Sequence, residues 1–268
     1  MADHSDVRLH ADVHPGQGPP VLLVHGFLSS RAHWAPNLDA LRTVSTPVVV
    51  ELFGHGRSPA PTERRLISPA AYVAQFERLR AELGVDRWAV IGHSLGGALV
   101  LTYALDRPER VSQVVFTNSQ SALADDEWRR RTSGQAQVLA GRIRQGGRQL
   151  LAEHPMHPKR GRRLPTDVQD LLVADYELLD PDGVAALVLH TAPRSSVRDR
   201  VGELSAPALL TVGSAERRFQ RAAAFARATI PDLVVVELAG AGHNVNLHAV
   251  KGWNEAVVDF LGPPTSRR

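Results

Sequence analysis

The chain has 268 residues, a net charge of +3 and 43% hydrophobic residues, which is enough for one large domain with a sizeable core. It contains no cysteine, which excludes disulfides and thiolate nucleophiles and is compatible with a reducing cytosol. No apolar stretch approaches the roughly 20 residues of a membrane span, and the first six residues lack a secretory pattern, so we expect a cytoplasmic protein without a membrane partner.

Six short apolar runs predict the strands of a central sheet, and helix signals separate them. Continuous Val, Leu and Ile runs of this length are typical of parallel strands that are covered on both faces. Residues 69–83 predict an amphipathic helix that starts at a proline and is followed by Gly84, and a second one closes the chain around Trp253. The alternation predicts an α/β fold with a mostly parallel sheet flanked by helices. The predicted strands are residues 21–24, 48–52, 88–91, 114–116, 208–212 and 234–238.

A Gly-x-Ser-x-Gly turn joins the strand at residues 88–91 to an apolar helical run. Such a turn holds its serine in strained backbone geometry, so the residues two before and two after it must lack a β-carbon. Gly92 and Gly96 occupy those two positions. The pattern predicts that Ser94 is a nucleophile at the end of a strand. The alternative is a tight strand-to-helix turn that holds its serine by coincidence.

No core strand is predicted between about Ser119 and Ser205. The pattern of this stretch instead indicates short, arginine-rich helices, interrupted by Gly146, Gly147 and several prolines. Because both flanks return to the sheet pattern, we interpret residues 119–205 as a helical cap inserted into a core of residues 1–118 and 206–268.

Basic residues concentrate in this predicted cap. Residues 128–163 carry ten basic residues and one acid, a net charge of +9, so the rest of the chain is negative. One interpretation of this charge is a site for carboxylates, because guanidinium groups pair with carboxylates through two parallel hydrogen bonds. The alternatives are a solvated helical face and a nucleic-acid surface; the lack of interleaved aromatic residues disfavours the latter. The ten are Arg129, Arg130, Arg131, Arg142, Arg144, Arg148, Lys159, Arg160, Arg162 and Arg163.

A serine hydroxyl needs a base to remove its proton. His243 lies in the segment Gly-Ala-Gly-His-Asn directly after the last predicted strand, at the sheet edge where α/β sites assemble. We predict that it is the base. The same Gly-Ala-Gly segment could suggest a dinucleotide loop, but the third glycine is missing, and no cofactor is predicted.

The acid that orients the base should follow the strand at residues 208–212. That loop contains no aspartate, and Glu216 occupies the expected offset. The alternatives are that Glu216 forms a surface ion pair with a neighbouring arginine, that Asp125 or Asp199 serves, or that the triad has no acid.

Two backbone N–H groups are expected to stabilise the oxyanion. One belongs to Leu95, which follows the nucleophile, and the other to Phe27 in the loop after the first predicted strand. His25 in that loop is predicted to be structural, and His93 is predicted to support the serine turn or bind substrate. A metal site is not predicted, because the histidine pair around Met156 has no further ligand cluster.

With these residues assigned, the chain resembles the α/β-hydrolase superfamily over nearly its full length. Within it, the chain is most similar to the menaquinone-pathway 2-succinyl-6-hydroxy-2,4-cyclohexadiene-1-carboxylate synthases, lyases that eliminate pyruvate. This resemblance implies a polyanionic substrate, which agrees with the basic segment, and we therefore predict that Arg129, Arg130 and Arg131 bind a carboxylate-bearing small molecule. The superfamily segments are His25-Gly26-Phe27, Gly54-His55-Gly56 and Gly92-His93-Ser94-Leu95-Gly96-Gly97, and those closer to the lyases are Glu127-Trp128-Arg129-Arg130-Arg131 and Glu216-x-Arg218-Phe219.

The chain departs from the lyase pattern at three positions. It has Ala98 where the lyases carry an arginine, His93 where they carry an aromatic residue, and Glu216 where they carry an aspartate. The leading hypothesis is therefore a cofactor-free serine hydrolase acting on an ester, thioester or lactone. The second is a lyase that uses the same triad to abstract a proton, and the third is a non-catalytic binding protein on this fold.

Overall fold

The computed structural model describes residues 7–161 and 163–262. Residues 1–6, where no secretory signal is predicted, and Arg162, one of the ten basic residues of the predicted cap, lie outside the described residues. Across the described ranges, no helix is both long enough and apolar enough to cross a membrane.

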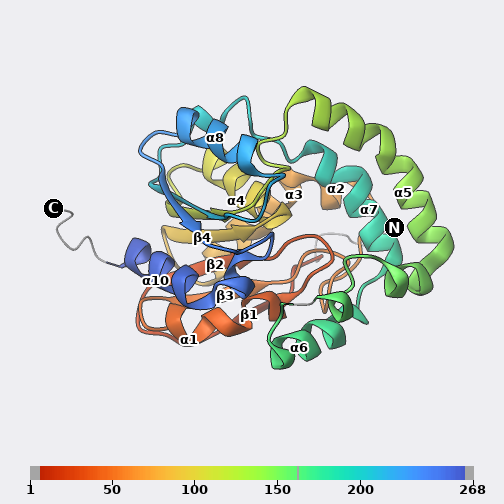
Figure 1. The fold of residues 1–268 in the computed structure, drawn as a ribbon, viewed down its shortest axis with the longest axis horizontal. Helices are drawn as coiled ribbons and strands as arrows, with labels where there is room; N and C mark the ends of the chain where they lie inside the picture. Colours follow the sequence, from red (N-terminus) through yellow and green to blue (C-terminus); the bar gives the residue numbers. More distant parts are fainter. Residues whose placement is uncertain (1–6, 162, 263–268) are drawn as a thin grey trace.

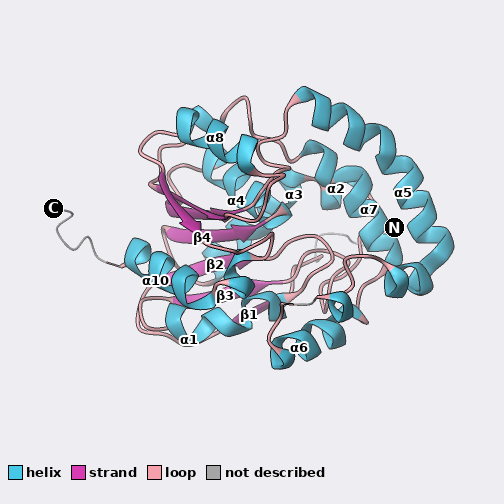
Figure 2. Ribbon diagram, viewed as in Figure 1, coloured by secondary structure: helices cyan, strands magenta, loops and turns pink. Residues whose placement is uncertain are grey.

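One seven-stranded sheet forms the centre of the molecule, with the strand order β1-β3-β2-β4-β5-β6-β7 (Figure 2). Strand β1 pairs antiparallel with β3, and every other pairing is parallel. The predicted mostly parallel sheet is therefore confirmed. The strands are β1 Ala11–Val13, β2 Pro20–Val24, β3 Thr46–Val50, β4 Trp88–His93, β5 Val111–Thr117, β6 Ala208–Gly213 and β7 Val234–Leu238.

α-Helices and short 3₁₀ segments flank and connect these strands. The α-helices are α1 Leu38–Leu41, α2 Arg64–Ile67, α3 Pro69–Glu82, α4 Leu95–Asp106, α5 Asp126–Glu153, α6 Thr166–Tyr176, α7 Pro181–His190, α8 Gln220–Thr229, α9 Val245–His248 and α10 Val250–Leu261. The 3₁₀ turns are η2 Arg31–Asn37, η3 Pro158–Arg160, η4 Ala192–Arg194 and η5 Val201–Glu203. Helices α3 and α10 confirm the two helices predicted from amphipathic spacing.

The sheet has an apolar core on each face. Along β2, Leu22 and Val24 pack into one core with α3, α4 and α8, while Val21 and Leu23 pack into the other with α1 and α10. This alternation follows from the two-residue period of a strand. Because both faces are covered (Figure 1), the central strands are apolar throughout, as the continuous runs predicted.

Two strand assignments differ from the prediction. The first strand, β1, is only three residues long and lies at the sheet edge, partly exposed, so it carries no apolar run. Strand β3 ends at Val50, two residues before the predicted end. Leu52 is fully buried, but its N–H donates to the His25 ring rather than to a strand. The hydrophobic residues after Val50 are therefore buried without being paired in the sheet.

Residues 119–205 contain no strand in the part that the structure describes. Helices α5 and α7 pack together, bury Leu28 and partly bury Phe27, both of which follow β2. Helix α6 packs on Ala32 and Leu247 in the same way. Helix α5 is kinked at Gly147 (φ 52°), one of the predicted breaks. These three helices gather on one side of the molecule, away from α10 (Figure 1).

Candidate active site

Ser94 lies at the turn between β4 and α4, with φ 52° and ψ −117°. Few residues other than glycine adopt a positive φ without strain. A β-carbon on Gly92 would lie 2.4 Å from the carbonyl oxygen of Gly96, and one on Gly96 would lie 2.1 Å from that of Val24. The predicted need for glycine at both positions is confirmed. The turn is fixed by hydrogen bonds, since the Ser94 N–H donates to Thr117 (2.9 Å) and the Ser119 hydroxyl donates to the Ser94 carbonyl (2.5 Å).

His243 and Glu216 meet at the carboxyl edge of the sheet, where the loops after β7 and β6 lie side by side. The Nδ1 atom of His243 is 3.5 Å from Oε2 of Glu216. The hydrogen bond with His243 lowers the pKa of Glu216, burial opposes this shift, and the backbone N–H and the charge of Arg218 add to it. The other predicted acids have other partners: Asp199 pairs with Arg129 at 2.9 Å, and Asp125 caps α5.

Two buried side chains hold the loop of His243 in place through its backbone carbonyl. The Nε2–H of His93 donates to the carbonyl oxygen of His243 (3.0 Å), and the side-chain amide of Asn118 donates to the same oxygen (2.8 Å). The His93 ring stacks on His33 at 4.3 Å between centroids and meets the His243 ring edge-on at 4.9 Å. Burial lowers the pKa of His93 well below its ordinary value and that of His33 to about 3. Both rings are therefore neutral near neutral pH.

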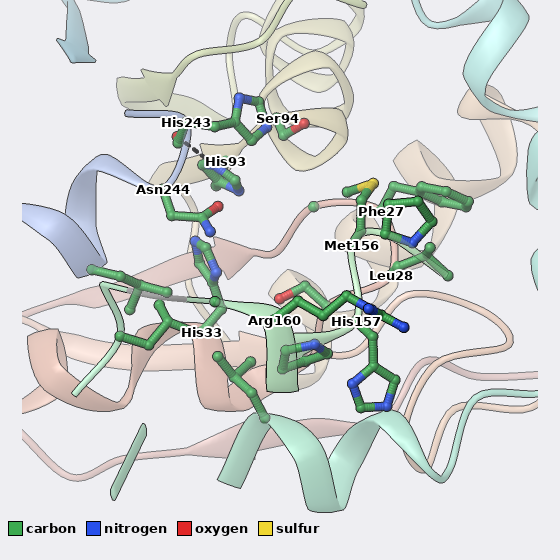
Figure 3. A pocket seen from close by; sticks show the side chains of 18 residues that line it. Phe27, Leu28, His33, His93, Ser94, Met156, His157, Arg160, His243 and Asn244 are labelled. Atoms are coloured by element: carbon green, nitrogen blue, oxygen red, sulfur yellow. Dashed lines mark hydrogen bonds between the residues drawn. The ribbon is translucent and has the colours of Figure 1, made fainter. Parts of the chain in front are cut away.

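Ser94 opens into two cavities. The first, the histidine cavity, has a volume of about 280 Å³ and is lined by His33, His93, Ser94 and His243. Figure 3 shows Ser94 and the rings of His93 and His243 towards one end, and Arg160 and His157 towards the other. The second, the helix cavity, has a volume of about 300 Å³ and is lined by Phe27, Ser94, Leu95 and residues of α5 and α7. Residues from 119–205 line both cavities.

The two predicted oxyanion donors, Phe27 and Leu95, lie together at Ser94 in the lining of the helix cavity. Histidines fix the loop that carries Phe27. The Nδ1–H of His25 donates to the Gly26 carbonyl (2.7 Å), and its Nε2 accepts the N–H of Leu52 (3.1 Å). The predicted structural role of His25 is confirmed by these bonds.

The turn at residues 54–58 supports the same loop. Gly54 and Gly56 have φ values of 73° and 54°, which are typical of a turn that glycine permits. His55, between them, accepts the N–H of Leu28 at 3.2 Å.

The three arginines predicted to bind substrate lie at the start of α5. Arg129 is paired with Asp126 (2.6 Å) and Asp199 (2.9 Å), and Arg130 is exposed. Arg131 lines a third cavity, and none of the three lines the cavities at Ser94. The reason is helical spacing: α5 directs Trp128, Thr132, Gln135 and Ala136 into the helix cavity, one face of a 3.6-residue period. Their binding of substrate stays a prediction.

Three residues of this site were not predicted from the sequence. Arg160 lines the histidine cavity, although the sequence showed only that it belongs to a basic segment. Asn118 and His33 lie in segments without any motif, so only the fold reveals their contacts with His243 and His93.

Comparisons with known proteins identify the fold and the family. The family model described as alpha/beta hydrolase fold matches residues 19–249. A Bacillus subtilis protein named "Putative 2-succinyl-6-hydroxy-2,4-cyclohexadiene-1-carboxylate synthase" is 25% identical over 94% of this chain and 93% of its own length. MenH from S. aureus superposes with a TM-score of 0.83 at 16% identity, covering 94% of this chain and 97% of that one. A thermophilic esterase from Thermogutta terrifontis superposes with a TM-score of 0.80 at 25% identity, covering 94% and 92%.

Proposed function

This chain belongs to the alpha/beta hydrolase fold family, and from that premise we propose that it is a serine hydrolase that cleaves an ester, thioester or lactone. The observation that carries the proposal is the arrangement around one cavity: Ser94 on a strained turn, and His243 with its Nδ1 atom 3.5 Å from Glu216. The mostly parallel sheet explains this arrangement, because the loops that carry the three residues all follow strands at the same edge.

The reaction begins with a proton transfer. Glu216 accepts a hydrogen bond from Nδ1–H of His243, which leaves Nε2 to take the hydroxyl proton of Ser94 as its oxygen attacks the carbonyl carbon. The carbonyl oxygen becomes an oxyanion, and the backbone N–H groups of Phe27 and Leu95 donate to it. When the bond to the leaving group breaks, His243 returns the proton to the departing oxygen or sulfur. The acyl group stays on Ser94.

Water completes the cycle. His243 takes a proton from the attacking water, the ester bond to Ser94 breaks, and the carboxylic acid leaves as the serine regains its proton. We propose that residues 119–205 act as the cap, because residues of this segment line both cavities at Ser94. A closed roof excludes bulk water and strengthens the electrostatic interactions beneath it.

A fluorophosphonate probe tests the nucleophile directly, with p-nitrophenyl butyrate as the turnover substrate. We expect the wild-type protein to hydrolyse the ester and to carry one probe adduct, mapped by mass spectrometry to Ser94, and the Ser94→Ala variant to do neither. Ser133→Ala on the exposed side of α5 is the matched control and should keep both properties. Absence of both labelling and turnover in the wild-type protein would reject the hydrolase assignment.

A second candidate is a lyase that eliminates pyruvate with the same triad. The similarity over 94% of the chain to the Bacillus subtilis protein favours it, as does the position of Arg160 in the same cavity as His243, where a guanidinium suits a carboxylate. In this reaction the Ser94–His243 pair abstracts a proton from carbon instead of forming an acyl-enzyme.

Product analysis separates the two candidates. Incubation with the enolpyruvyl precursor of the menaquinone pathway should release pyruvate without an acyl-enzyme burst if the lyase assignment is correct. If no pyruvate forms while the aryl ester is hydrolysed, the lyase assignment is wrong and the hydrolase assignment stands.

A further inference from the structure

A third cavity lies beside the helix cavity, and arginines dominate its lining. Its volume is about 730 Å³, within the usual range for ligand sites of roughly 300–1,000 Å³. Four arginines line it from three parts of the chain: Arg131 of α5, Arg198 before η5, and Arg218 and Arg221, which lie just before and within the first turn of α8. We call it the arginine cavity.

These four arginines differ from others nearby in forming no close ion pair with a described residue. Arg129 and Arg200 each pair with an aspartate at 2.9 Å or less. In contrast, none of the four arginines in the cavity has a carboxylate oxygen within 4.0 Å among the residues that the structure describes. Positive charges that outnumber the negative charges around them repel each other, and an anionic ligand would relieve that repulsion.

Contacts with the surrounding protein hold part of the cluster in place. The guanidinium of Arg198 donates to the Leu123 carbonyl (2.9 Å) and lies 3.5 Å over the Phe225 ring. The two carboxylates of the lining, Asp125 and Glu127, leave a net charge of +2. Asp125 is already engaged, since it accepts the N–H of Trp128. That hydrogen bond lowers the pKa of Asp125, and the charges of Arg198, Arg221 and Arg131 lower it further.

The arginine cavity adjoins the reacting serine through the helix cavity. Gln120 and Trp128 line both of these cavities, and the helix cavity ends at Ser94, Phe27 and Leu95. His243, which returns the proton to the leaving group, lines the histidine cavity and not the helix cavity. In the proposed reaction the leaving group therefore occupies the histidine cavity, and the acyl group extends through the helix cavity towards the four arginines.

We propose that the arginine cavity binds an anionic group at the far end of the acyl chain, so that the substrate is the monoester or monothioester of a dicarboxylic acid. This inference rests on the proposed hydrolase function. The apolar helix cavity takes the methylene chain, Trp128 marks the passage between the cavities, and the arginines take the terminal carboxylate. Guanidinium groups suit that role because each can donate two parallel hydrogen bonds to one carboxylate.

Two esters of equal chain length test the proposal: mono-p-nitrophenyl suberate, which ends in a carboxylate, and p-nitrophenyl octanoate, which ends in a methyl group. We expect the wild-type protein to show a higher kcat/KM for the suberate ester. In the Arg131→Gln/Arg221→Gln variant, the ratio of the two kcat/KM values should fall roughly tenfold, mainly through KM for the suberate ester. Added salt should reduce the ratio in the wild-type protein, because it screens exposed charges.

The matched control is Arg142→Gln/Arg227→Gln, which removes the same two charges from exposed positions of the same helices outside the cavity. It should keep the wild-type ratio. An equal ratio in both double variants, or no preference for the suberate ester in the wild-type protein, would overturn the anionic subsite while leaving the hydrolase assignment intact.

Direct binding separates this proposal from the function on which it rests. Titration calorimetry with disodium suberate should show binding to the wild-type protein and weaker binding to Arg131→Gln/Arg221→Gln. If neither ester is hydrolysed but this difference is seen, the hydrolase assignment fails and the anion cavity stands. If suberate binds both proteins equally or not at all, the cavity assignment is wrong.

Discussion

At the scale of single residues, the site depends on whether the side chain of Glu216 is long enough to contact His243. It contacts His243 across two loops that follow neighbouring strands, and a glutamate spans this gap with one methylene more than an aspartate. The lowered pKa of Glu216 has the hydrogen bond with His243 as its largest cause. The carboxylate is thus in the charged form that the proposed mechanism requires for stabilising a protonated imidazole.

Replacing Glu216 by glutamine should slow ester turnover by roughly 10³–10⁴-fold, because an amide can hold the imidazole in the wrong tautomer and does not stabilise its charge. The measurement is kcat for p-nitrophenyl butyrate. Glu237→Gln, at an exposed position on β7, is the control and should turn over at the wild-type rate. An unchanged rate in Glu216→Gln would mean that the acid of the triad lies elsewhere.

The sequence was most informative where chemistry and local backbone constrain the same residues. Gly92 and Gly96 predicted the turn at Ser94, because only glycine fits so close to the neighbouring carbonyls. The late position of His243 and the offset of Glu216 predicted their meeting, since parallel strands bring their ends together. Asn118, His33 and Arg160 were not predictable, because each reaches the site through tertiary contacts that leave no local pattern.

At the scale of whole elements, the sequence predicts strands whose side chains are buried, and it misses a strand that is paired but partly exposed. Apolar runs predicted the central strands, but β1 is too short and too exposed to produce one. In α5 the charged residues at the start lie on a different face from the one that lines the helix cavity. The face that lines the helix cavity carries Trp128, Thr132 and Gln135, which are not apolar enough to be recognised as an inward stripe.

Substitutions at two helical glycines test how closely the helices pack at those positions. Gly96→Ala in α4 should destabilise the protein by about 3 kcal/mol, because the new β-carbon meets the Val24 carbonyl and the backbone must move. Gly134→Ala in α5 meets nothing within 4 Å and should stabilise it by about 0.5–1 kcal/mol, as alanine favours a helix. Denaturant titrations measure both; equal effects would contradict the close packing at the serine turn.

At the scale of the whole molecule, buried histidines determine how the protein responds to acid. Burial lowers the pKa of His33 to about 3 and that of His55 to about 4, and it lowers those of His25 and His93 well below the ordinary value. The folded protein keeps these rings neutral, whereas the unfolded chain binds a proton on each of them below about pH 6.5. Because the unfolded state then binds more protons, stability falls as the pH drops below about 6.5.

Removing one of these rings should flatten that dependence. In His33→Phe the free energy of unfolding should vary less with pH between about pH 4 and pH 6, by about 1.4 kcal/mol for each pH unit, which corresponds to one proton. Urea titrations at several pH values give the two slopes. Parallel stability curves for the variant and the wild-type protein would show that His33 is already protonated in the fold.

The separation of the two cavities at Ser94 has a consequence for the fate of the acyl-enzyme. In the proposed reaction, the acyl chain fills one side of the serine after the first product has departed, and the space next to His243 is vacant for a second nucleophile. An alcohol that fits there would compete with water, because the same imidazole can deprotonate either of them. In alcohol-rich surroundings the protein would then act as a transacylase, building one ester from another.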